Sequence, residues 1–139
     1  MCLILIAHQF NKQAPLLVLA NRDEFYDRPT KDAAPWDECS ELIAGRDLAS
    51  GGSWFGARGL RWASVTNVRE GMKPSDRHRS RGWLVRDYLL SKDSPQDFLS
   101  KIANQIGAYP GFNLLAGNGQ ELWYCSNRGP VAQRLEPGI

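Results

Sequence analysis

A cysteine at position 2 has the clearest chemical potential in this sequence. The chain begins Met1-Cys2-Leu3, and cysteine is small enough at the second position for a methionine aminopeptidase to remove Met1. Cys2 would then carry a thiol and a free α-amine, whose ordinary pKa of roughly 7.7–8.0 suits it to activate the adjacent sulfur. The pattern predicts a nucleophile and its base on one residue. The alternative is an ordinary second residue before a core strand.

Two polar segments follow predicted strands. Asn21-Arg22-Asp23-Glu24 comes directly after an apolar run, a place where loop-borne chemistry commonly lies. A solvated turn whose charges pair with one another is the alternative. Asn67 ends a later strand much as Asn21 ends the earlier one. We therefore expect both polar ends to face the same side of one sheet.

The most basic stretch of the chain runs from residue 68 to residue 81 and contains Arg69, Arg77 and Arg79. A loop of this kind can hold an anionic ligand group. A charge-rich loop with glycine and proline is also typical of solvated surface.

Composition excludes several classes of protein. The 139 residues carry a net charge of only +2 and 42% apolar residues, which argues against a nucleic-acid binder driven by bulk charge. No apolar run approaches the roughly 20 residues of a membrane span. Three widely spaced cysteines without a CxxC pair, and two histidines, indicate neither a disulfide framework nor a metal centre. We expect one soluble, cytoplasmic domain over residues 1–139 that requires no cofactor.

The elements that must position these residues read as antiparallel strands around two helices. The first two apolar runs predict a hairpin of buried strands, and residues 27–40, with two prolines, predict an irregular connection. One helix is expected over residues 82–90 from its apolar spacing. The second has Ser94 as N-cap, Pro95 in its first turn and Gly107 as its stop. The predicted strands are residues 3–7, 16–20, 42–45, 54–57, 60–67, 112–117 and 122–125.

Several short segments, read together, carry a family resemblance. After the Met-Cys start come residues 20–24, 51–56, 66–69, 80–82 and 112–115 in a fixed order. This pattern resembles the NRDE family of transport and Golgi organisation proteins, and the match runs along the whole chain. Family members are usually much longer, so the resemblance covers their N-terminal portion.

The resemblance implies a fold and a set of site residues. The family is similar to N-terminal-nucleophile hydrolases, so the implied fold is an α+β, αββα sandwich of antiparallel sheets, truncated here. In a cysteine amidohydrolase of this type, Cys2 would be the nucleophile and Arg22 would stabilise its thiolate. Asp23 would accept a hydrogen bond from the α-ammonium. Asn67 would donate to the oxyanion.

The resemblance also implies an alternative that is not an enzyme. Relatives have been implicated in haem mobilisation and in lipid or acyl-coenzyme A handling, so the site would bind an anionic amphiphile without cleaving it. The thiolate of Cys2, or His8, would then contact a haem iron; the alternative for His8 is a packed or solvent-facing residue of the strand. A truncated sandwich would also leave sheet edges unpaired, which favours a homo-oligomer. The expected ligand-binding residues are Asn21, Glu24, Arg69, Arg77 and Arg79.

Overall fold

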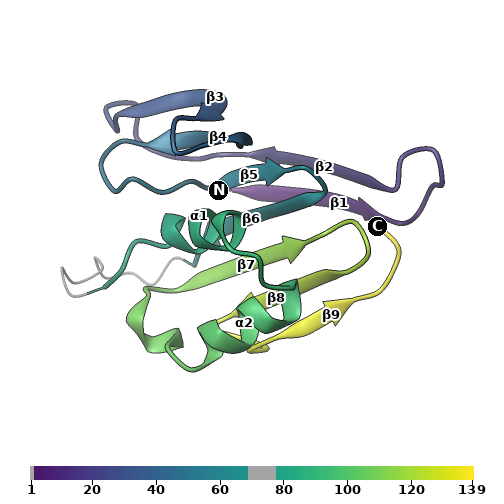
Figure 1. The fold of residues 1–139 in the computed structure, drawn as a ribbon. Coiled ribbons are helices and arrows are strands. Elements are labelled where there is room, and N and C mark those ends of the chain that lie inside the picture. Colours follow the sequence, from purple (N-terminus) through teal and green to yellow (C-terminus); the bar gives the residue numbers. More distant parts are fainter. Residues whose placement is uncertain (1, 69–77) are drawn as a thin grey trace.

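The described part of the chain forms two antiparallel sheets and two α-helices (Figure 1). The computed structural model describes residues 2–68 and 78–139. The smaller sheet is a hairpin of β1 (Leu3–His8) and β2 (Leu16–Asn21). The larger sheet is an antiparallel meander of seven strands in chain order: β3 (Thr30–Trp36), β4 (Cys39–Asp47), β5 (Phe55–Arg58), β6 (Arg61–Asn67), β7 (Phe112–Gly117), β8 (Leu122–Ser126) and β9 (Gln133–Leu135).

The helices cover one face of the large sheet. They lie in the connection between β6 and β7: α1 (Gly82–Leu90), α2 (Pro95–Ala103) and a 3₁₀ turn at Ile106–Ala108. The two α-helices bury an apolar face against alternate residues of the strands. The core on this side contains Leu42, Ala63, Val65, Leu84, Val85, Leu89, Leu99 and Leu114.

The hairpin of β1 and β2 lies against the opposite face of the large sheet. Gly56 of β5 faces α1, since a Cβ there would lie 2.9 Å from Leu89. The neighbouring residues Phe55 and Ala57 therefore point the other way, and they line a cavity together with Val18 of β2. The described residues thus form three layers, namely helices, large sheet and hairpin.

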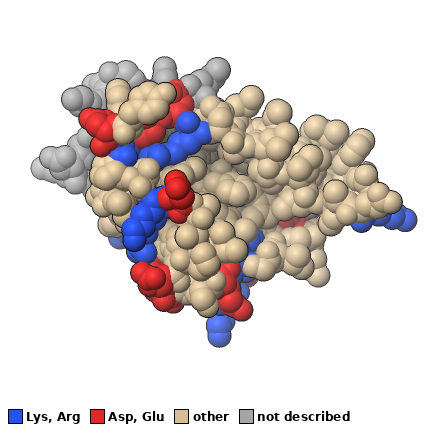
Figure 2. All heavy atoms as spheres, turned by 90° about the horizontal axis from the view of Figure 1, so that it is seen from above, with Lys and Arg blue, Asp and Glu red and all other residues tan. Residues whose placement is uncertain are grey.

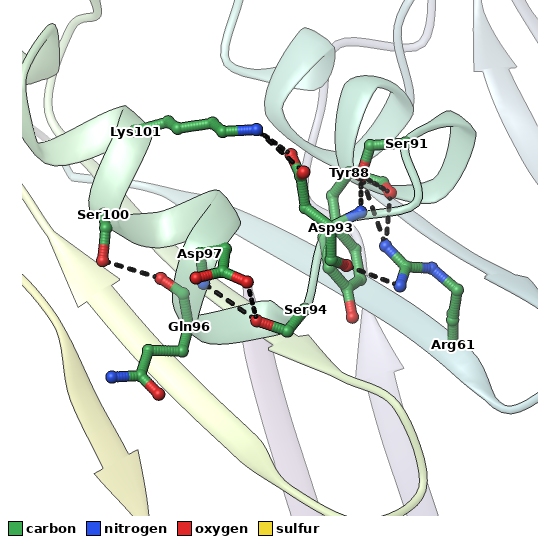
Figure 3. A network of polar contacts seen from close by, with 9 residues as sticks. All are labelled: Arg61, Tyr88, Ser91, Asp93, Ser94, Gln96, Asp97, Ser100 and Lys101. Carbon is green, nitrogen blue, oxygen red and sulfur yellow. Dashed lines mark hydrogen bonds and ion pairs between the residues drawn. The ribbon is translucent and has the colours of Figure 1, made fainter.

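A polar network ties the helices to the sheet (Figure 3). The guanidinium of Arg61, on β6, donates to the carbonyls of Tyr88 and Asp93 at 2.8 Å and 2.7 Å and lies 4.2 Å from the centre of the Tyr88 ring. The Ser94 hydroxyl accepts from the N–H of Asp97 at 3.1 Å, which caps α2. These contacts satisfy backbone groups at the junction of the helices.

Much of the predicted architecture is confirmed. The fold is α+β with antiparallel sheets, in keeping with the N-terminal-nucleophile type, and the first two strands pair as a hairpin. Helix α1 has the predicted bounds, and Cys125 is fully buried in strand packing.

Four expectations were wrong, and one strand was not predicted. Residues 27–40 contain β3, an edge strand that accommodates Pro35 beside a register shift, because an edge strand tolerates a missing N–H. Strand β9 was missed, and α2 ends at Ala103 before a separate 3₁₀ turn. The hairpin is not buried, since its outer face is uncovered. Finally, Asn21 and Asn67 end strands of different sheets.

Candidate functional site

A cavity of about 130 Å³ lies where the ends of the two sheets meet. Cys2, directly before β1, lines it together with the segment that follows β2. From the large sheet, Asn67 at the end of β6 completes this part of the wall. The predicted catalytic set of Cys2, Arg22, Asp23 and Asn67 therefore lies around one cavity, with Glu24 beside it.

Backbone hydrogen bonds hold the thiol at the cavity. The N–H of Asp23 donates to Sγ of Cys2 at 3.4 Å. Next to it, the N–H of Leu3 donates to Oδ1 of Asn21 at 2.7 Å, so Asn21 fixes the start of β1. The two contacts fix the positions of the thiol and of the first residue of β1 relative to the segment after β2.

Arg22 is held against an aromatic ring of the large sheet. Its guanidinium lies 4.1 Å from the centre of the Trp54 ring, and it pairs with Glu24 at 3.9 Å. The Trp54 ring in turn occupies the space beside Gly45, where a Cβ would lie only 2.6 Å away. A planar guanidinium over an indole face is a favourable cation–π arrangement, so Trp54 fixes the position of the positive charge.

A second arginine forms a partly buried ion pair in the wall. Nη2 of Arg28 donates to a carboxylate oxygen of Asp47 at 2.7 Å, and Nε donates to the same oxygen at 3.0 Å. Burial acts to raise the pKa of Asp47, but hydrogen bonds from Arg28, Ser50 and the Ala49 N–H outweigh it and lower that pKa overall. The pair stays charged, which fixes the loop after Glu24 to β4.

The glycine-rich turn before β5 packs directly on the start of α1. The N–H of Ser53 donates to the carbonyl of Gly82 at 3.1 Å. A Cβ on Gly52 would lie 2.4 Å from the carbonyl carbon of Gly82, so only glycine permits this approach. The contact brings Ser53, Arg81 and Gly82 into the cavity wall.

The lining carries charges of both signs. Three arginines and three carboxylates surround the cavity: Arg22, Arg28, Arg81, Asp23, Glu24 and Asp47. On the face seen in Figure 2, basic and acidic side chains likewise lie side by side, without an extended area of one sign. Such a lining favours a compact polar group rather than a polyanion.

The remaining predicted ligand-binding residues lie elsewhere. Asn21 is outside the lining of the cavity. Arg79 is exposed and donates to Oε1 of Gln105 at 2.9 Å, toward the end of α2. Arg69 and Arg77 lie outside the described residues.

Sequence reasoning missed several residues of the wall. Arg28 had a local signal, because it follows Glu24 by four residues and the two pair at 3.8 Å. Ser53, Trp54 and Arg81 lie within the segments that carried the family resemblance, but no role was assigned to them. Asp47 had no local signal, since only the pairing of β3 with β4 brings it to Arg28.

A second cavity, of about 380 Å³, lies between the hairpin and the large sheet. His8 is 6% exposed and lines this cavity at the far end of β1. Burial, and to a smaller extent the charge of Arg134, lower the pKa of His8 from its ordinary 6.5. The remaining lining is Pro15, Leu16, Val18, Phe55, Ala57, Gly59, Leu60, Trp62 and Gly119. Among the described residues there is no group of three or more histidine, cysteine or acidic side chains that could hold a metal ion.

The sequence is similar to one known protein family and to several of its members. The model of the family described as Transport and Golgi organisation 2 matches residues 1–139. The chain is 37% identical over 134 residues to the transport and Golgi organization 2 homolog of Mus musculus and 36% identical over 134 residues to that of Homo sapiens, covering in each case 88% of this chain and 48% of the relative. The protein of the same name from Drosophila melanogaster is 29% identical over 129 residues, with 84% and 45% covered. The chain thus spans about half the length of these relatives.

No helix among the described residues has the length and apolar character needed to cross a membrane.

Proposed function

Because the chain belongs to the transport and Golgi organisation 2 family, we propose that it serves transport and Golgi organisation as an N-terminal cysteine amidohydrolase. The observation that carries this proposal is the convergence of Cys2 with the polar ends of β2 and β6 on one cavity. These groups are distant in sequence and belong to two sheets. A nucleophile, charged partners and an amide donor in one cavity are the parts that amide hydrolysis requires.

The proposed reaction proceeds through an acyl-enzyme. After removal of Met1, the α-amine of Cys2 takes the thiol proton, and the sulfur attacks the amide carbonyl carbon. The Asn67 side chain donates to the developing oxyanion, an effect worth about 3–4 kcal/mol in comparable sites. The leaving amine takes the proton from the α-ammonium as the C–N bond breaks. Water then attacks the thioester, releasing a carboxylic acid and restoring the thiol.

The charged residues of the wall would prepare this chemistry. The N–H of Asp23 donates to Cys2 Sγ and would hold the sulfur in place, and Arg22, fixed over Trp54, adds positive charge to the same cavity. The Asp23 carboxylate would accept from the α-ammonium. The pair of Arg28 and Asp47 would act only by holding the loop that carries Glu24.

Thiol labelling tests the nucleophile directly. Intact mass should show that Met1 is absent, and iodoacetamide at neutral pH should modify Cys2 about tenfold faster than Cys39, because only Cys2 has its own α-amine to take the thiol proton. Burial raises the pKa of Cys125 to about 11, so Cys125 should remain unmodified in the folded protein and serves as an internal check.

Substitution completes this test. Cys2→Ala should abolish cleavage in a screen of amide substrates, while Cys39→Ala, at a similarly half-buried thiol, should leave cleavage unchanged. Retention of Met1, or equal labelling of Cys2 and Cys39, would exclude the hydrolase.

The second candidate function is binding of an anionic amphiphile such as haem or acyl-coenzyme A. The cavity of about 380 Å³ favours it, because its lining is mainly apolar. His8 fits the role of a haem ligand. Burial lowers its pKa and keeps the imidazole neutral, and the neutral imidazole is the form that binds iron. In this reading the hydrolase site has no turnover.

Titration distinguishes the two functions. For a haem-binding protein, the haem absorbance should shift on mixing, His8→Phe should abolish the shift, and Cys2→Ala should leave it intact. For acyl-coenzyme A, titration calorimetry should show binding by the unmodified protein and by Cys2→Ala. His8→Phe should show none. Absence of binding by both ligands would exclude this second candidate.

A further inference from the structure

Two exposed aromatic side chains lie in the segment of chain that passes the cavity at Cys2. Phe25 is 82% exposed, and Tyr26 is fully exposed. They occupy a turn whose two ends, Glu24 and Arg28, both line the cavity. The aromatic pair therefore stands directly beside the opening, although neither side chain belongs to the lining.

The turn is held firmly at its base. The N–H of Arg28 donates to the carbonyl of Phe25 at 3.1 Å, and the N–H of Phe25 donates to Oε1 of Glu24 at 3.0 Å. The ion pair of Arg28 with Asp47 then ties the turn to β4. These contacts hold the backbone that carries the two rings next to the cavity wall.

The size of the cavity determines what must lie on its rim. Its volume is about 130 Å³. Pockets that enclose a whole organic ligand are usually about 300–1,000 Å³. The cavity thus has room for the reacting amide and its immediate neighbours. The rest of a substrate must extend across the rim.

The chemistry of the rim then indicates the class of substrate. The six charges of the lining balance, so net charge discriminates weakly between substrates. Exposed aromatic rings instead offer flat apolar surface, which binds other rings by stacking. We propose that Phe25 and Tyr26 determine specificity by stacking on the part of the substrate outside the cavity, and that the substrate is an amide bearing an aromatic group. This inference rests on the proposed amidohydrolase function.

Alkylation of Cys2 by two reagents tests the inference without a known substrate. Iodoacetamide fits the cavity, whereas N-benzyl iodoacetamide adds a ring that would reach the rim. The rate at Cys2 divided by the rate at Cys39 in the same sample corrects for intrinsic reactivity. We expect this ratio to be roughly fivefold higher for the benzyl reagent, in line with the strength of one aromatic contact.

Variants assign the preference to the rim. In the double variant Phe25→Ala/Tyr26→Ala, the Cys2-to-Cys39 rate ratio should become the same for both reagents, while the iodoacetamide rate at Cys2 should change less than about twofold. Tyr26→Phe should keep the preference for the benzyl reagent, because the ring remains. Phe10→Ala is the matched control, since Phe10 is an aromatic residue, 66% exposed, in the distant turn of the hairpin. It should have no effect.

The outcomes separate the inference from the function on which it rests. Equal ratios in the unmodified protein, or a preference that survives the double alanine variant, would overturn the role of the two rings. A Cys2 that reacts no faster than Cys39 with iodoacetamide would overturn the hydrolase instead. A further outcome is that the Cys2-to-Cys39 rate ratio is the same for both reagents in the unmodified protein and in every variant, while the double alanine variant loses binding to another protein. The rings would then form a protein-docking site, and the specificity role would be wrong.

Discussion

At the scale of single residues, position along β1 separates two kinds of chemistry. Cys2, Ile4, Ile6 and His8 alternate onto the inner face of the strand. Cys2 lies at the polar cavity and His8 at the apolar one. The environments differ because charged loops surround the start of β1, whereas the inner faces of the two sheets surround its end.

Protonation of His8 is expected to destabilise the fold. The pKa of His8 is lowered by burial first and by Arg134 second. The neutral imidazole is therefore favoured in the folded state. Its contribution to the stability of the fold is complete above the ordinary pKa of 6.5 and is lost as the pH falls through the lower pKa of the folded state. The free energy of unfolding should decrease below about pH 6.5, by at most about 1.4 kcal/mol per pH unit, the limit for one proton.

Urea unfolding of variants at several pH values measures this effect. His8→Phe should flatten the dependence between about pH 7.5 and pH 5.5, the interval around an ordinary histidine pKa. His78→Phe is the matched control, because His78 is exposed, and it should retain the slope. An unchanged slope in His8→Phe would show that other groups cause the dependence.

At the scale of elements, the approach of the glycine-rich turn to α1 builds one side of the cavity. Gly52→Ala would place a Cβ 2.4 Å from the backbone of Gly82, and backbone cannot move aside as a flexible side chain can. We expect a loss of about 1–3 kcal/mol in the free energy of unfolding, as for other overpacked sites, and slower labelling of Cys2 because the wall shifts.

Gly107→Ala is the control for this change. No atom lies within 4 Å of a Cβ at Gly107, so the same substitution should change stability by less than about 0.5 kcal/mol, the usual range at such surface sites. Chemical unfolding of Gly52→Ala and Gly107→Ala under the same conditions measures the loss in the free energy of unfolding for each. Equal losses of stability would show that the close contact of Gly52 with α1 is not the cause of the loss in Gly52→Ala.

At the scale of the whole molecule, the outer face of the hairpin is an exposed apolar surface. Leu5 and Leu19 are opposite one another on β1 and β2 and are 54% and 57% exposed, and Leu3 and Leu17 beside them are 57% and 52% exposed. An apolar face of this kind promotes association. We expect the chain to form a homo-oligomer through it.

Sedimentation velocity of a charge variant tests this expectation. Leu19→Lys should raise the dissociation constant about tenfold or more, because burying a leucine is worth about 1.5–3 kcal/mol. Val131→Lys is the control, since Val131 is 48% exposed and lies away from the hairpin, between β8 and β9. A monomer at all concentrations, or equal effects of both variants, would exclude this face.

The sequence by itself determined the local elements and the first candidates for the site. Apolar spacing defined α1 to its ends, and Ser94 with Pro95 marked the start of α2, because helix periodicity and capping depend on neighbouring residues. The Met-Cys start and the polar segment after β2 identified Cys2, Arg22 and Asp23 as candidates for the same reason. These features are properties of short stretches of chain.

Only the tertiary structure decided which residues meet and which faces are covered. Asp47 reaches Arg28 through the pairing of β3 with β4, and Gly52 reaches Gly82 through the packing of α1 on the sheet. The continuous apolar run of β1 is compatible with burial on both faces, yet Leu3 and Leu5 on its outer face are more than half exposed. Strand pairing and layer packing join residues that are far apart in sequence, and no local pattern encodes the choice among the contacts available to them.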